Sequence, residues 1–274
     1  MEDRKEKEYL ICIDSDGCAM NTMNSKHIHC FGPEWIKQFG LEKVEKEALE
    51  YWNQVNLFTK SRGINRFKGL AKGLLWAKEK GYETEGLEKF VQWTEETKEL
   101  SNPSLLEACQ REKNECMEQA LLWSIHVNLS IQRLKDEEGP FKNAKKVMEQ
   151  LSKEADLAAV SSANKQAIEE EWTKYRLKSY CKVLLSQESG TKEACIRGLL
   201  EKGYEKEKTI MVGDAMGDYE AAIKNGIWFY PIIVQREEES WERLEKEAFP
   251  RLKKGAFDEK YQREIFEEFE KALE

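Results

Sequence analysis

The stretch Tyr9-Leu10-Ile11-Cys12-Ile13-Asp14-Ser15-Asp16-Gly17 decides the fold of this 274-residue chain. Its first five residues form a short apolar run, which is typical of a buried strand in a parallel sheet. Polar residues follow directly, at the carboxyl edge where α/β sheets bind their ligands. We therefore predict a parallel sheet that carries Asp14 and Asp16 at its functional edge.

A long helical segment separates this strand from the rest of the predicted sheet. Apolar residues recur at helical spacing from about Phe31 to Glu138, without strand-like alternation. The last helix of the segment is predicted to have Asn102 as its N-cap and Pro103 at its first position. We expect it to continue through Leu134 and to stop before Gly139-Pro140. An insertion of roughly 120 residues is long enough to have its own core.

After Pro140, helical and strand patterns alternate along the chain, which predicts right-handed βαβ units. The expected strands are 156–161, 181–185, 209–212 and 227–230, and the expected helices are 141–154, 165–176, 191–202 and 219–224. We therefore predict an α/β fold with a Rossmann-like parallel-sheet core at residues 1–20 and 140–235. An all-helical domain at 21–139 is inserted after the first strand, and a helical extension at 236–274 packs on the core.

The composition excludes several classes of protein. Hydrophobic residues make up 40% of the chain, charged residues 35%, and the mean hydropathy is -0.73, as in a globular protein. The net charge of -8 argues against a nucleic-acid partner. We expect no membrane-spanning segment and no secretory signal, and hence a cytoplasmic protein. The sequence leaves the oligomeric state open.

Polar residues end the first strand and follow the later ones, and in a parallel sheet these ends converge on one cleft. They are Asp14 and Asp16, Ser161 and Ser162, Lys192, and Asp214 and Asp218. Carboxylates that are forced together repel each other unless a cation joins them, and Mg²⁺ prefers a few carboxylates with water and phosphate. A lysine in the same cleft points to an anionic substrate. We therefore predict Mg²⁺ as cofactor and a phosphate ester as substrate.

These residues also carry a resemblance to a known family. Asp14-x-Asp16-Gly17 after a hydrophobic strand resembles the first motif of the haloacid dehalogenase (HAD) superfamily of phosphohydrolases. Val160-Ser161 resembles the second motif, Lys192 the third, and Val212-Gly213-Asp214-Ala215-Met216-Gly217-Asp218 the fourth. The order of the motifs is that of the family. The resemblance implies a HAD core, and it identifies the helical insertion as the family's C1-type cap.

The resemblance implies a role for each acid. Asp14 is the implied nucleophile, which becomes an aspartyl phosphate, and Asp16 is the implied acid that protonates the leaving group and then activates water. Mg²⁺ is implied to bind the carboxylates of Asp14 and Asp214 and the main-chain carbonyl of Asp16. Asp218 is implied to act on the metal through a water molecule.

Ser161, Ser162 and Lys192 are implied to bind the transferring phosphoryl group, with Lys192 also assisting catalysis. Each has a simpler interpretation. The serines could be helix N-caps, although Asn164 suits that position better, and Lys192 could be a solvated helix charge.

The predicted function is that of a Mg²⁺-dependent phosphatase acting on a small soluble phosphate monoester through an aspartyl phosphate. Asp16 argues against dehalogenation, because dehalogenases of this superfamily lack the second acid. A phosphomutase, a phosphonate hydrolase and a non-catalytic binding protein that retains the fold remain as alternatives. A phosphonate hydrolase needs a cap lysine that forms a Schiff base, and Lys26 and Lys60 keep this alternative open. Cys18 and Asn21 stand where the family commonly has Thr and Asp.

Two groups in the inserted segment invite a functional interpretation. Arg62, Asn65 and Arg66 belong to a basic stretch in an otherwise acidic block, and we predict that they bind the polar part of the substrate. A solvated loop between helices is the alternative. His27, His29 and Cys30 follow the first motif, and we favour hinge or substrate contacts over a zinc site.

Overall fold

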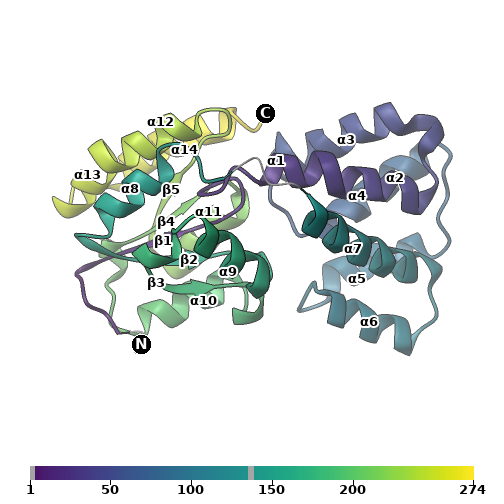
Figure 1. The fold of residues 1–274 in the computed structure, drawn as a ribbon, viewed down its shortest axis with the longest axis horizontal. Coiled ribbons are helices and arrows are strands. Elements are labelled where there is room, and N and C mark those ends of the chain that lie inside the picture. Colours follow the sequence, from purple (N-terminus) through teal and green to yellow (C-terminus); the bar gives the residue numbers. More distant parts are fainter. Residues whose placement is uncertain (1–3, 135–138) are drawn as a thin grey trace. The chain divides into compact units, whose positions relative to one another are not determined.

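A parallel sheet of five strands lies at the centre of the α/β part of the chain, among the residues that the structure describes (Figure 1). The strand order is β3-β2-β1-β4-β5, so the first strand is the central one. β1 (Tyr9–Ile13) pairs with β2 (Ala155–Val160) on one side and with β4 (Thr209–Gly213) on the other. β3 (Cys181–Leu185) and β5 (Trp228–Pro231) are the outer strands. The prediction of a parallel α/β sheet interrupted by a helical insertion is confirmed.

The computed structural model describes residues 4–134 and 139–274. It divides the chain into two units. The first, here the α/β unit, comprises Met1–Met23 and Glu137–Glu274, and the second, here the helical unit, comprises Asn24–Asp136.

Helices cover the sheet, and the alternation of side chains along β1 decides which helices each residue meets. Ile11 and Ile13 belong to one buried cluster with side chains of α8, α9 and α12. Cys12 points to the opposite face. Burial raises the pKa of its thiol, and the nearby Cys195 of α10 raises it further. The helices between the strands are α8 (Ala144–Leu151), α9 (Lys165–Lys174), η3 (Lys178–Tyr180), η4 (Gln187–Ser189), α10 (Lys192–Leu200), η5 (Lys206–Lys208) and α11 (Met216–Asn225).

The last forty residues form helices that pack on the sheet. They are α12 (Glu237–Arg243), η6 (Leu244–Ala248), α13 (Phe249–Lys253) and α14 (Glu259–Lys271). Trp241 and Phe249 are buried in the same cluster as Ile11. α14 lies against the outer strand β5, where the Gln262 side chain accepts a hydrogen bond of 2.8 Å from the backbone N–H of Phe229. This contact protects an edge strand that would otherwise expose an unpaired donor.

Aromatic side chains make up the centre of the helical unit. Trp35, Trp52 and Trp123 are fully buried, and the ring of Trp52 lies 5.2 Å from that of Trp35 and 5.8 Å from that of Trp123. Such tilted and edge-on pairs are the geometry that aromatic rings prefer. The elements are α1 (Met23–Lys26), η1 (His27–Phe31), α2 (Gly32–Phe39), η2 (Glu42–Val44), α3 (Glu45–Leu57), α4 (Arg66–Glu79), α5 (Leu87–Glu96), α6 (Asn102–Arg111) and α7 (Glu115–Arg133).

The prediction of one continuous helix from Asn102 to Leu134 is wrong. The segment forms two helices, α6 and α7, because Asn114 begins a new one: its side chain accepts a hydrogen bond from Met117 N. The N-cap of α6 is Ser101, whose hydroxyl accepts from Ser104 N, and not Asn102. Asn102 instead accepts a hydrogen bond from the Ser124 hydroxyl.

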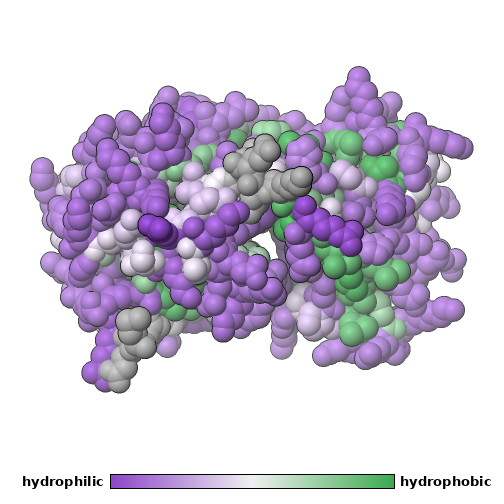
Figure 2. Space-filling view, in the orientation of Figure 1, coloured by the Kyte–Doolittle hydropathy of each residue, from purple (hydrophilic) through white to green (hydrophobic). Residues whose placement is uncertain are grey.

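Hydrophilic residues dominate the face of the molecule shown in Figure 2, in agreement with the low mean hydropathy of the chain. Exposed apolar side chains of the helical unit include Leu122, Ile125 and Leu129, one face of α7. None of the helices in the described parts of the chain is long and apolar enough to span a membrane.

The cap at Asn114 generates a prediction about stability. Asn114→Ala removes both the acceptor for Met117 N and the donor to the carbonyl of Gly86, which lies 3.1 Å away. We expect the free energy of unfolding to fall by about 1–2 kcal/mol. Urea unfolding followed by tryptophan fluorescence measures this, because five of the eight tryptophans lie in the helical unit.

The neighbouring exposed residue provides the control. Lys113→Ala should change the free energy of unfolding by less than about 0.5 kcal/mol. Equal stability of Asn114→Ala and Lys113→Ala would show that Asn114 does not stabilise the start of α7.

Candidate active site

The loop after β1 is a tight turn that brings its polar residues to the sheet edge. Asp14 extends the pairing of β1 with β4, because its N–H donates to Val212 O at 3.0 Å. The carbonyl of Ser15 then accepts from Cys18 N at 3.2 Å and from Met20 N at 2.8 Å. Gly17 has φ +86°, a left-handed conformation that glycine adopts without strain.

The structure brings three acids and one lysine together at this edge. One carboxylate oxygen from each of Asp14, Asp214 and Asp218 lies within 4.8 Å of the others, and all three residues are buried. The Lys192 ammonium lies 2.7 Å from Asp14 Oδ1 and 2.6 Å from Asp218 Oδ1. These residues come from the ends of β1 and β4 and the first turns of α10 and α11. The predicted convergence of strand ends is therefore present for these four residues.

Local capping and close packing place the two less obvious members of the cluster. Thr191 is the N-cap of α10, and its hydroxyl accepts from Ala194 N, so Lys192 is the first residue of that helix. Asp218 lies in the first turn of α11, where its Oδ2 accepts from Ala215 N at 3.2 Å. Gly213 makes room for it, because a Cβ atom there would lie 2.3 Å from the Asp218 Cγ.

Burial and mutual repulsion dominate the electrostatics of the cluster. Burial raises the pKa of Asp14 well above its usual range, and the charges of Asp218 and Asp214 raise it further, while Lys192 opposes the shift. Burial alone lowers the pKa of Lys192, but the adjacent carboxylates of Asp14 and Asp218 outweigh it and raise that pKa. Lys192 is therefore charged at neutral pH.

The donor set of this cluster fits a hard divalent cation. Three carboxyl groups and one ammonium share this buried site, so a divalent cation would offset the mutual repulsion of the carboxylates that ionise there. Oxygen ligands of this kind are those that Mg²⁺ uses in phosphate-handling sites. We therefore identify Asp14, Asp214 and Asp218 as residues that could hold the metal.

Asp16 lies outside this carboxylate cluster and is half-buried. Its Oδ1 accepts a hydrogen bond from the hydroxyl of Thr22, which comes six residues later. Thr22 is buried, and sequence reasoning did not find it. The only signal was its closeness to the motif.

The two serines after β2 differ in their environment. Ser161 is buried, and its hydroxyl accepts from Ala163 N at 3.0 Å, while Ser162 is exposed. Asn164 is the N-cap of α9, because its side chain accepts from Ala167 N. This confirms that neither serine has that structural role.

The three polar residues predicted to bind substrate make contacts within the helical unit. Arg62 is buried and donates to Leu57 O at 2.8 Å. Asn65 is the N-cap of α4 and also donates to Leu100 O, and Arg66 donates to the Asn128 side chain at 2.7 Å. The stretch is therefore not simply a solvated loop, and a role in substrate binding stays a prediction.

His27, His29 and Cys30 occupy η1, a short π-helix. His27 Nδ1 accepts from Trp52 Nε1 at 3.2 Å, and its ring stacks on Phe31. His29 is exposed and Cys30 is buried. In the described parts of the chain, the groups of side chains suited to a metal do not include these residues.

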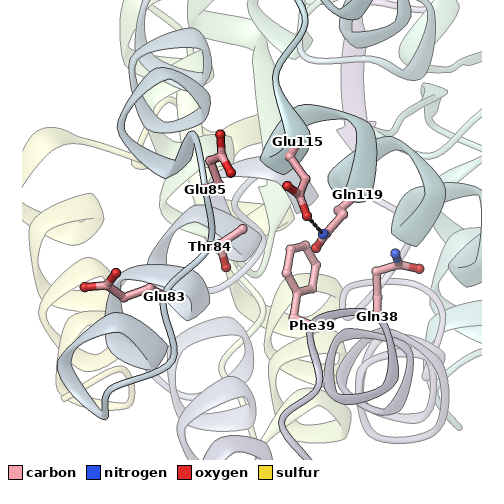
Figure 3. A pocket seen from close by; sticks show the side chains of 7 residues that line it. All are labelled: Gln38, Phe39, Glu83, Thr84, Glu85, Glu115 and Gln119. Atoms are coloured by element: carbon pink, nitrogen blue, oxygen red, sulfur yellow. Dashed lines mark hydrogen bonds between the residues drawn. The ribbon is translucent and has the colours of Figure 1, made fainter.

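A pocket of 180 Å³ in the helical unit has a different chemistry from the acid cluster. Figure 3 shows its lining, which consists of Gln38, Phe39, Glu83, Thr84, Glu85, Glu115 and Gln119. Three glutamates would repel a phosphate ester, so this pocket is not a candidate for the predicted substrate.

Comparison with known proteins shows which family this chain matches. A family model of haloacid dehalogenase-like hydrolases matches residues 84–232, which include Lys192, Asp214 and Asp218. Asp14 and Asp16 lie before the matched range. A search of curated proteins finds no match.

Solved structures resemble nearly the whole chain. A protein named as a phosphoglycolate phosphatase from Lactobacillus delbrueckii subsp. bulgaricus is 15% identical, with 89% of this chain and 98% of that chain covered and a TM-score of 0.54. A haloacid dehalogenase-like hydrolase from Streptococcus pneumoniae is 14% identical, with 88% and 92% covered and a TM-score of 0.51. At this level of identity the likeness shows a shared fold.

The packing of Gly213 against Asp218 can be tested by adding one methyl group. We expect Gly213→Ala to lower the free energy of unfolding by about 1–3 kcal/mol, because Asp218 or the β4 backbone must move. Gly217→Ala is the control, since a Cβ there meets open space. Urea unfolding of both variants in EDTA measures the difference, and equal stabilities would contradict the expected clash.

A second prediction concerns pH and the one cation of the cluster. The raised pKa of Asp14 means that the folded state loses stability as pH rises through that pKa, and Lys192 limits this loss. Without Lys192 the loss should be larger. We expect Lys192→Met to be destabilised by about 3 kcal/mol near neutral pH and by less at about pH 5.

Urea unfolding of wild type and Lys192→Met across this pH range, in EDTA, measures the effect. Lys224→Met is the control, because Lys224 is exposed and lies 3.5 Å from Glu193 at the surface. A deficit of Lys192→Met that stays constant with pH would contradict the assigned charge balance.

Proposed function

Because this chain belongs to the haloacid dehalogenase-like hydrolase family, we propose that it is a Mg²⁺-dependent phosphatase that hydrolyses a small soluble phosphate monoester. The observation that carries the proposal is the buried cluster in which the Lys192 ammonium contacts Asp14 and Asp218 beside Asp214. An anionic substrate needs cations at this position, and an in-line attack needs a carboxylate next to them.

In the proposed reaction, a carboxylate oxygen of Asp14 attacks phosphorus, and the bond between phosphorus and the ester oxygen breaks. Asp16 gives its proton to the departing alkoxide, so an alcohol leaves and an aspartyl phosphate remains on Asp14. Asp16, now ionised, accepts a proton from water, which attacks the same phosphorus; the bond between phosphorus and the Asp14 oxygen breaks, which releases inorganic phosphate and restores the Asp14 carboxylate. The hydrogen bond from Thr22 supports this assignment, because it orients the Asp16 carboxyl.

The carboxylates of Asp14 and Asp214 and the main-chain carbonyl of Asp16 are the proposed ligands of Mg²⁺. Both oxygens of Asp218 already accept hydrogen bonds from Lys192 and Ala215, which favours an indirect role for it. When bound, Mg²⁺ would neutralise the acids and the negative charge of the phosphoryl group.

Lys192 and Ser161 are the proposed partners of the phosphoryl oxygens. Lys192 offers a charged donor in contact with Asp14, and the buried Ser161 hydroxyl follows the neighbouring strand β2. Ser162 is a weaker candidate, because it is exposed. We propose that the helical unit selects the substrate, with Arg62, Asn65 and Arg66 as its candidate residues.

Hydrolysis of a generic aryl phosphate tests the chemistry. We expect turnover with Mg²⁺, loss of turnover in EDTA, and a decrease of at least about a thousandfold in Asp14→Asn. Asp258→Asn is the matched control: Asp258 caps α14, a position where asparagine serves equally well, so this variant should keep full activity.

Binding of beryllium fluoride with Mg²⁺ is a second readout that does not depend on the alcohol part of the substrate. We expect wild type, but not Asp14→Asn, to be stabilised against heat by this mimic of the phosphoryl group. Turnover that persists in Asp14→Asn, or a wild type that neither hydrolyses the ester nor binds the mimic, would refute the proposal.

A further inference from the structure

Two buried tryptophans hold the loop that carries Asp14 and Asp16. Trp172 of α9 donates its indole N–H to the Ser15 hydroxyl at 2.8 Å, and Trp241 of α12 donates to the carbonyl of Cys18 at 3.0 Å. Both tryptophans are fully buried, and the exposed fractions of Ser15 and Cys18 are 1% and 0%. No bulk water competes for either hydrogen bond.

Side chains alternate between the two faces of the sheet along β1. This explains why the Ser15 side chain contacts a different layer of helices from the Asp14 side chain. Ile11 and Ile13 face the cluster that includes Trp172 and Trp241, and Ser15 continues this series. Asp14 points the opposite way, to Lys192 of α10. Fixing the Ser15 side chain therefore fixes the peptide units on both sides of it, which set the directions of the two acids.

We propose that Trp172 and Trp241 are positioning residues for catalysis, which hold the first-motif loop through its Ser15 hydroxyl and its Cys18 carbonyl. The inference rests on the proposed function. It assigns to the C-terminal extension, through Trp241, a part in the reaction although it contributes no reacting group.

Each indole group contacts a part of the loop that the backbone turn leaves without a partner of its own. Within the turn, the Ser15 carbonyl accepts from Cys18 N and Met20 N, and the Asp14 carbonyl accepts from Ala19 N. The Ser15 hydroxyl and the Cys18 carbonyl lie outside this pattern. The two tryptophans lie in helices that cover the sheet, and they thus restrain the turn at both of its ends.

Replacement by phenylalanine tests the inference, because it keeps a buried ring and removes only the donor. With wild type active on an aryl phosphate, we expect kcat of Trp172→Phe and of Trp241→Phe to fall about tenfold to a hundredfold. KM should change less than about threefold, because substrate contacts are intact. A small displacement of a catalytic group has an effect of this size.

Trp228→Phe is the matched control. Trp228 also donates its indole N–H, to Glu207 O at 3.1 Å, through an exposed hydrogen bond in the same unit but away from the loop. Its kcat should remain within about twofold of wild type. If Trp172→Phe and Trp241→Phe lose stability but keep the kcat of Trp228→Phe, the two tryptophans have a structural role alone and the inference is wrong.

Ser15→Ala removes the acceptor without shrinking the core, so it provides a test if Trp172→Phe folds poorly. We expect a similar loss of kcat, and no further loss in the double variant Ser15→Ala/Trp172→Phe, because both changes break one hydrogen bond. Losses that multiply in the double variant would show that the two residues act independently.

Hydrogen exchange separates a failure of this inference from a failure of the proposed function. The peptide that contains residues 14–20 should exchange faster in Trp172→Phe and Trp241→Phe than in Trp228→Phe. A wild type that neither hydrolyses the aryl phosphate nor binds beryllium fluoride would refute the proposed function, while exchange would still show whether the indole groups order the loop. Unchanged exchange of this peptide would overturn the inference.

Discussion

Three carboxylates and one ammonium group share a buried edge of the sheet, and the need to balance their charges constrains much of the α/β unit. Asp14 follows β1, Asp214 follows β4, and Lys192 and Asp218 lie in the first turns of two helices that cover the same face. They meet because β1 and β4 are neighbours in the sheet. A change of strand order would leave a charge buried without its partner, at a cost of several kcal/mol. The cluster thus couples the topology to the chemistry.

The charge balance also explains why Lys192 belongs to the site although nothing in its local sequence marks it. Lysine is abundant in this chain, and a lysine in the first turn of a helix is unfavourable by itself, since the helix dipole is positive there. The contacts with Asp14 and Asp218 offset this. A residue in a locally unfavourable place is often one that serves the site.

The sequence predicted the sheet and the converging strand ends because these depend on short apolar runs and on the residues that follow them. Predictions from the sequence missed features that depend on contacts between residues far apart in the chain. The helical periodicity continues from Leu106 to Val127 across the break at Asn114, whose side chain caps α7 and also donates to the Gly86 carbonyl, far away in sequence. For Arg62 the sequence could not predict the burial of the side chain or its hydrogen bond to Leu57 O, and its role in substrate binding stays a prediction.

For the site, the acids could be predicted, but their supports could not. Trp172 and Trp241 are 157 and 223 residues away from the groups to which they donate. In the sequence, each is a tryptophan on an amphipathic helix, which predicts burial and says nothing about where the N–H points. Cys18, which departs from the family pattern, makes two polar contacts: its thiol donates to Val212 O at 3.5 Å, and its carbonyl accepts from Trp241.

The position of β1 in the sheet has a consequence for how the chain acquires its structure. β1 is the central strand, yet its partners β2 and β4 begin only at Ala155 and Thr209, after the whole helical unit. During synthesis, the contiguous helical unit can complete its aromatic core while the five apolar residues of β1 still lack both neighbours. Contacts of such long sequence separation form slowly, and unpaired strands associate with other chains. Until β2 and β4 have been synthesised, β1 therefore lacks both of the neighbours that would protect it from pairing with another chain.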